Sequence, residues 1–174
     1  MVSNKKRLYL ALYPSATDSG REESRYHLSF LIGPKNEDQP DVPGMRYHVK
    51  IPPTGEWKFE EVPVRNVRAT ITLLVRVVIA KVQNEKRLVD IFRNTPVVQN
   101  DPNFNSRSWA IDALSRIAQD GKAVGTAVLD WEKIEEQAHK YVREKIEAGR
   151  YESGQDMTRP KPTWDLLEGR ELVP

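Results

Sequence analysis

The chain up to residue 82 consists of short apolar segments whose connections are too short to contain crossover helices. Apolar and polar residues alternate to varying degrees in four short segments, at 7–13, 26–33, 45–51 and 57–62. A fifth segment, at 69–82, is rich in β-branched residues. Consecutive strands that lack a crossover pair in the antiparallel sense. The N-terminal half therefore predicts a mostly antiparallel sheet.

The rest of the chain carries apolar residues at helical spacing. Asn84 is placed to cap a first helix. A second helix follows Ser106 and stops at Gly121, and a third begins after Asp130 and stops at Gly149. Strands followed by helices predict the α+β class, with an antiparallel sheet packed against helices.

The length of 174 residues is that of one domain. We expect this single α+β domain to occupy residues 1–150. Residues 151–174 are rich in proline and charge and are expected to form a C-terminal arm. That arm is either loose or docked on the domain through Trp164 and Leu167.

Charge balance and the lack of cysteine exclude several classes of protein. The 27 basic and 25 acidic residues are interspersed, which argues against a nucleic-acid partner. Without cysteine, disulfides and thiolate metal sites are excluded. The longest apolar stretch, at 71–82, is interrupted by Arg76 and Lys81, whereas a transmembrane helix needs about 20 apolar residues. With no signal-peptide pattern in the sequence, we expect a cytoplasmic protein without a transmembrane segment.

Two of the three histidines fall on neighbouring predicted strands. Strand alternation places His27 on the polar face of one strand, and His48 on the face that carries Arg46 in the next. If these strands pair, the two histidines are close across the ladder. The alternative is a pair of surface histidines, because polar strand faces often carry them. His139, on the third helix, is expected to be structural or exposed.

Ser106 stands in the stretch "DPNFNSRSWAIDAL", where the chain turns into the second helix. Its spacing from the apolar residues that follow places it on the side of the helix that packs on the sheet. A nucleophile at a helix N-terminus gains from the helix dipole and from N–H groups that can bind an oxyanion. Serine is also among the commonest N-cap residues, so Ser106 is alternatively a cap.

The order of these residues is that of a known family. The stretches "YHLSFLIGP" and "YHV", followed by Asn105-Ser106 at a helix start, resemble the lecithin retinol acyltransferase-like proteins. These are circularly permuted relatives of NlpC-type and papain-like cysteine peptidases. The resemblance covers residues 7–118, and the chain also resembles a group of small fungal proteins of unknown activity.

The resemblance implies a circularly permuted papain-like arrangement and a role for each matched residue. His27 matches the general base, His48 matches the histidine that orients it, and Ser106 stands where the family has its nucleophilic cysteine. The backbone N–H of Ser106 or Arg107 would hold the oxyanion, beside Asn105. The implied activity is acyl transfer or hydrolysis of an amide, ester or thioester, on a small-molecule or peptide substrate and without a cofactor.

A serine in the place of cysteine leaves three interpretations open. The chain is a serine enzyme, a binding protein of the same fold that has lost the reaction, or a protein with an engineered replacement. A thiol has a pKa of about 8.5, whereas a hydroxyl needs a base within reach to react. A non-catalytic ligand-binding protein is therefore one alternative, and an isomerase or cyclase with two acid–base histidines is another. No metal site is expected from His27 and His48 alone.

Overall fold

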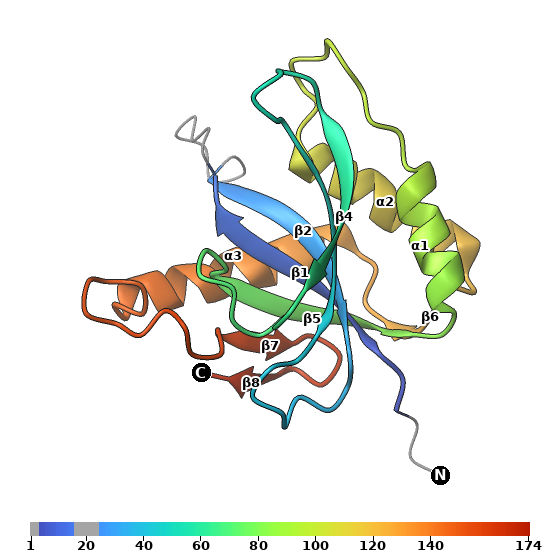
Figure 1. The fold of residues 1–174 in the computed structure, drawn as a ribbon. Coiled ribbons are helices and arrows are strands. Elements are labelled where there is room, and N and C mark those ends of the chain that lie inside the picture. The colour runs from blue at the N-terminus through green and yellow to red at the C-terminus, as the bar shows by residue number, and fades with distance from the viewer. Residues whose placement is uncertain (1–3, 16–24) are drawn as a thin grey trace.

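The computed structural model describes residues 4–15 and 25–174. Over these residues the chain is an α+β protein, in which a sheet of eight strands packs against three helices (Figure 1). The strands are β1 (Arg7–Pro14), β2 (Tyr26–Gly33), β3 (Gly44–Lys50), β4 (Lys58–Val64), β5 (Val75–Val82), β6 (Val124–Ala127), β7 (Thr163–Asp165) and β8 (Arg170–Val173). The helices are α1 (Glu85–Asn94), α2 (Ser106–Asp120) and α3 (Trp131–Glu147).

The sheet is mixed, with the order β4-β3-β2-β1-β5-β7-β8 and β6 paired to β5. Strands β1 to β5 form antiparallel pairs with their neighbours, as their short connections predict. The expectation of an antiparallel sheet is wrong at one place, because β7 pairs with β5 in the parallel sense. A parallel neighbour is possible there since α3 and the chain after it provide the long crossover.

Residues 151–174 are docked on the body of the protein. They supply β7 and β8 to the sheet, and Trp164 packs against the main core. Of the two alternatives that the sequence left open, the loose arm is therefore wrong. The segment that was expected to be an appendage extends the same sheet, as the red strands of Figure 1 show.

The two faces of the sheet are covered differently. On one face, apolar side chains of β1, β2 and β5 pack against α1, α2 and α3 to form the main core. Among its largest buried side chains are Phe30, Phe92 and Trp109. A smaller cluster on the other face is built around Tyr9, Tyr13 and residues near them. This second face has no helix over it in the part of the chain that is described, and loops cover it (Figure 1).

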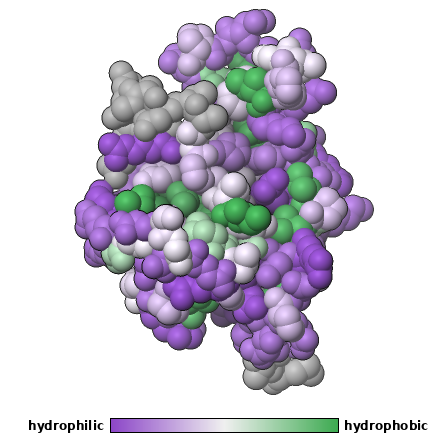
Figure 2. All heavy atoms as spheres, turned by 60° about the vertical axis from the view of Figure 1, so that its left-hand side comes forward, coloured by the Kyte–Doolittle hydropathy of each residue, from purple (hydrophilic) through white to green (hydrophobic). Residues whose placement is uncertain are grey.

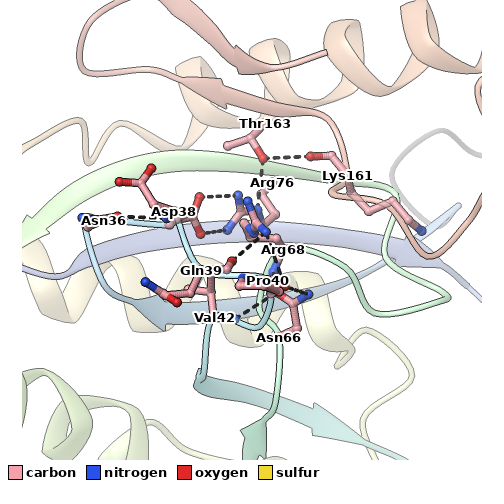
Figure 3. A network of polar contacts seen from close by, with 11 residues as sticks. Asn36, Asp38, Gln39, Pro40, Val42, Asn66, Arg68, Arg76, Lys161 and Thr163 are labelled. Carbon is pink, nitrogen blue, oxygen red and sulfur yellow. Dashed lines mark hydrogen bonds and ion pairs between the residues drawn. The ribbon is translucent and has the colours of Figure 1, made fainter.

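A buried ion pair connects one of these loops, the one between β2 and β3, to the centre of the sheet (Figure 3). Arg76 on β5 is fully buried, and its two Nη atoms donate to the carboxylate of Glu37 at 2.8 and 2.9 Å. Its Nε donates to Oγ1 of Thr163 on β7 at 3.0 Å, and its guanidinium carbon lies 4.5 Å from the ring centroid of Tyr9. Arg76 thus joins the β2–β3 loop, β5 and β7.

A buried lysine explains why β5 begins later than predicted. The sequence predicts a strand over 69–82, but the strand starts at Val75. Before it, the chain turns, and Nζ of Lys161 donates to the carbonyl oxygens of Thr70, Ile71 and Leu73 at 3.2, 3.1 and 2.8 Å. These carbonyl groups bind the lysine in place of a strand partner.

The outer surface matches the polar composition of the chain. Figure 2 shows one face that is largely hydrophilic, with apolar residues gathered in a band across its middle. Large apolar side chains that are exposed include Ile51, Ile71 and Val98. Within the described residues, no helix combines the length and the apolar character needed to cross a membrane.

Candidate functional site

The candidate site lies where β2 and β3 separate. The ladder between them runs from Phe30 opposite Tyr47 to Ile32 opposite Met45. Closer to the start of β2, the N–H of Leu28 donates instead to Oγ of Ser106 at 3.2 Å. The hydroxyl of Ser106, in the first turn of α2, therefore accepts the hydrogen bond of a main-chain N–H of β2 that lies beyond the ladder with β3.

Three side chains form a hydrogen-bonded series across β2, β3 and β4. Nε2 of His27 lies 2.8 Å from Nδ1 of His48, and Nε2 of His48 lies 3.0 Å from Oε2 of Glu60. Glu60 faces His48 directly in the β3–β4 ladder, and its other oxygen accepts from Nζ of Lys50 at 2.8 Å. The prediction that the two histidines are close across the sheet is confirmed.

The series fixes which nitrogen carries the proton in each ring. The hydrogen bond from Lys50 lowers the pKa of Glu60, which is therefore ionised and can only accept. Nε2 of His48 must then carry a proton, and its Nδ1 accepts from Nε2 of His27. Nδ1 of His27 is left with a lone pair, so this nitrogen is placed to take up a proton.

Both imidazole rings are neutral near pH 7. Burial, followed by the charges of His48 and Arg46, lowers the pKa of His27 to about 4. Burial also lowers the pKa of His48, although the hydrogen bond with Glu60 opposes this effect. A neutral His27 is the form that a general base requires.

Replacing Glu60 by glutamine tests this series. Glu60→Gln is expected to lower the pKa of His48 further, because the carboxylate is the group that raises it. The measurement is an NMR titration of the imidazole signals. The matched control is Glu61→Gln, since Glu61 pairs with Arg93 and should leave the pKa of His48 unchanged. An equal effect of the two substitutions would contradict the series.

Asn105, and not Ser106, caps α2. The side chain of Asn105 accepts from the N–H of Ser108 at 2.9 Å, and Oγ of Ser108 accepts from the N–H of Asn105 at 2.9 Å. This reciprocal pair is a capping box. Ser106 is the first residue inside the helix, so the interpretation of Ser106 as the N-cap is wrong.

The Ser106 side chain is buried beside the strand that carries His27. The residue is 6% exposed, and its hydroxyl oxygen accepts from the N–H of Leu28, the residue after His27. Across residues 4–15 and 25–174, no hydrogen bond joins Ser106 to His27. Catalytic hydrogen bonds are often long before a substrate is bound and tighten in the complex. The structure thus places the Ser106 hydroxyl against the backbone of the residue after His27, and Ser106 is not among the residues that line the cavity of His27.

The two residues predicted around the oxyanion site differ in placement. The guanidinium group of Arg107 pairs with Glu135 on α3, at 2.6 Å from Nε to Oε2 and 2.8 Å from Nη2 to Oε1. Asn105 instead lines the cavity at the site. The N–H of Ser106 lies in the first helical turn, where the helix offers no acceptor. The N–H of Arg107, the other predicted oxyanion donor, lies in the same turn.

His27, His48 and Asn105 line one open cavity of about 970 Å³. This volume lies in the range of sites for small molecules, about 300–1,000 Å³. The remaining lining residues are mostly aromatic, apolar or charged, and include Tyr13, Ile51, Trp57, Phe104, Arg46, Lys50 and Asp101. In the described part of the chain, no three His, Cys, Asp or Glu side chains are grouped to hold a metal ion.

Sequence reasoning missed Glu60, which completes the series. Its signal was the segment "WKFEEV", which follows the strand of His48 after a short turn. Two adjacent glutamates in that segment point to opposite faces of the sheet. Only the register of the hairpin decides that Glu60 faces His48, and the sequence does not define that register.

A family model described as "Family of unknown function (DUF6914)" matches residues 5–173. No curated protein and no solved structure matches the chain. The matched span runs from β1 to β8. It therefore contains the hydrogen-bonded series, the start of α2 and the cavity between them.

Proposed function

The chain belongs to the DUF6914 family, and we propose that it transfers or hydrolyses an acyl group through a covalent intermediate on Ser106. One observation carries this proposal. The series Glu60–His48–His27 ends at a cavity large enough for a substrate, which Asn105, the residue before Ser106, also lines, and the Ser106 hydroxyl bonds to the N–H of Leu28, the residue after His27. A proton acceptor, a nucleophile position and an N–H donor at a helix N-terminus are the groups that acyl transfer needs.

The proposed arrangement of the site is the circularly permuted papain-like one. In it, the strands that carry the general base and its partner precede the helix that carries the nucleophile. The chain has this order, with His27 on β2, His48 on β3 and Ser106 at the start of α2. The substrate is an acyl compound, either a small molecule or a peptide.

In the proposed reaction, Oγ of Ser106 attacks the carbonyl carbon while its proton moves to Nδ1 of His27. The positive charge that forms on His27 is stabilised through His48 by the carboxylate of Glu60. The N–H of Ser106 binds the oxyanion of the tetrahedral intermediate. His27 then gives its proton to the leaving group, and the carbon–leaving-group bond breaks. Water or a second acceptor then attacks the acyl-Ser106 ester and gives its proton to His27, which returns it to Oγ of Ser106 as the ester bond breaks.

Covalent labelling tests the nucleophile. The protein and its Ser106→Cys and Ser106→Ala variants are exposed to p-nitrophenyl esters and acyl thioesters, and intact masses are measured. We expect an acyl adduct at position 106 in Ser106→Cys, because a thiol is far more reactive than a hydroxyl. The adduct should be absent in Ser106→Ala. An unmodified Ser106→Cys protein would contradict the covalent mechanism.

Acid–base chemistry without a covalent step is the second candidate. It is favoured by one observation, that the Ser106 hydroxyl bonds to the N–H of Leu28 and not to His27. In that case His27 would move a proton on a bound substrate, as in an isomerase or cyclase. The labelling experiment separates the candidates, since this one predicts no adduct at position 106.

A further inference from the structure

Arg46 differs from the other cations around the site. Lys50 pairs with Glu60, and Arg93 pairs with Glu61. Among the residues that the structure describes, no carboxylate pairs with Arg46. Its Nε atom is buried and has no hydrogen-bond partner, and its guanidinium carbon lies 5.7 Å from the ring centroid of Tyr13. Within the described residues, a partly buried positive charge is therefore left without a counter-charge.

The charge of Arg46 affects both histidines that line the cavity. Arg46 lies on β3 two residues before His48, and it lines the same cavity as both histidines. It contributes to the lowered pKa of His27 and of His48. Its charge and its hydrogen bond with the side chain of Tyr13 also oppose the effect of burial, which raises the pKa of Tyr13. The charge of Arg46 thus shifts the pKa values of its neighbours, but no carboxylate among the described residues pairs with it.

A partly buried charge without a partner is less favourable than a paired one, and a ligand of opposite charge reduces that penalty. The planar guanidinium group binds a carboxylate through two parallel hydrogen bonds. We propose that Arg46 binds a carboxylate of the substrate, so that the acyl compound carries a carboxylate in addition to the reacting carbonyl group. This inference rests on the proposed function, because it assigns a substrate class to the same site.

The charges of the cavity favour a carboxylate over a phosphate. Of the cations that line it, Lys50 already has Glu60 at 2.8 Å, which leaves Arg46 to balance one negative charge. Asp101 also lines the cavity and adds repulsion to a doubly charged group. The aromatic rings of Trp57 and Phe104, 5.4 Å apart between centroids, offer an apolar surface to the rest of the substrate.

Binding to a protein that cannot react tests the carboxylate site. In the Ser106→Ala background, calorimetry compares glutaric acid mono-anilide with its primary amide and with the matching phosphonate. We expect the carboxylate to bind about 10- to 100-fold more tightly than the amide, as hydrogen bonds to charged groups imply. Arg46→Gln should remove this preference, and Arg46→Lys should keep part of it. The control is Arg65→Gln, which removes an 86% exposed side chain and should change nothing.

A second measurement tests whether Arg46 binds the carboxylate or only stabilises the fold. The bound carboxylate should raise the pKa of His27 in an NMR titration, because it cancels the charge of Arg46, whereas the amide should not. Equal binding of carboxylate and amide, tighter binding of the phosphonate, or an unchanged preference in Arg46→Gln would overturn the proposal. A carboxylate preference without labelling of Ser106→Cys would support this site and contradict the covalent function.

Discussion

Replacing His27 by alanine is expected to slow acylation of the Ser106→Cys protein by about 100- to 10,000-fold, the usual contribution of a general base. In the series of Glu60, His48 and His27, Nδ1 of His27 is the nitrogen that is left to accept a proton, and among the described residues no third imidazole is bonded into this series. The measurement is the single-turnover rate of adduct formation with a p-nitrophenyl ester, followed by intact mass.

The control for this prediction is His139→Ala. His139 lies on α3 with its ring 5.7 Å from that of Tyr26, away from the series, and its replacement should leave the rate nearly unchanged. The pH dependence gives a second check. Because the folded pKa of His27 is about 4, the ring stays neutral when the pH is lowered from 7 to 5. The advantage of the His27 protein over His27→Ala should therefore persist at pH 5, and its loss near pH 6.5 would contradict the lowered pKa.

Replacing Glu37 by leucine is expected to lower the free energy of unfolding by about 3–5 kcal/mol, because it leaves a buried charge without its partner. Arg76 is fully buried, and the carboxylate of Glu37 accepts from both of its Nη atoms. Urea denaturation followed by circular dichroism measures the change. The effect should extend to the site, since the β2–β3 loop joins the strands of His27 and His48.

A double variant and an exposed pair serve as controls. Glu37→Leu combined with Arg76→Met removes both charges and should regain much of the lost stability. The pair Arg65–Asp41 lies in the same region, but the Arg65 side chain is 86% exposed. Asp41→Leu should therefore cost less than about 1 kcal/mol. A similarly small loss for Glu37→Leu would show that the buried pair does not stabilise the loop.

Local signals in the sequence were sufficient for most strands, all three helices and the pairing of the two histidines. Asn84 and Asp130 cap their helices as predicted, because a cap depends on residues within one turn. Alternation placed His27 and His48 on one face for the same reason. The capping residue of α2 was misassigned because Asn105 and Ser106 are both favourable caps, and only the observed hydrogen bonds distinguish them.

Contacts between distant segments could not be predicted from local patterns in the sequence. The short strands β7 and β8 have little pattern of their own and depend on pairing with β5. In the sequence, Arg76 looks like an interruption of an apolar segment, whereas in the structure it is buried. The sequence does not reveal this, because its partner Glu37 lies in a loop 39 residues away. Glu60 required the register of a hairpin, and Arg46 required the knowledge that no carboxylate among the described residues faces it.

The capping box at the start of α2 separates the structural role of this turn from the chemical role that we propose for Ser106. Asn105 and Ser108 hold the helix start through each other, so neither bond involves the side chain at position 106. That side chain makes one hydrogen bond to the backbone, with Leu28. Hydroxyl and thiol can therefore be exchanged at this position with little effect on the helix. A single substitution at position 106 can therefore change the proposed nucleophile while the framework of the turn stays the same.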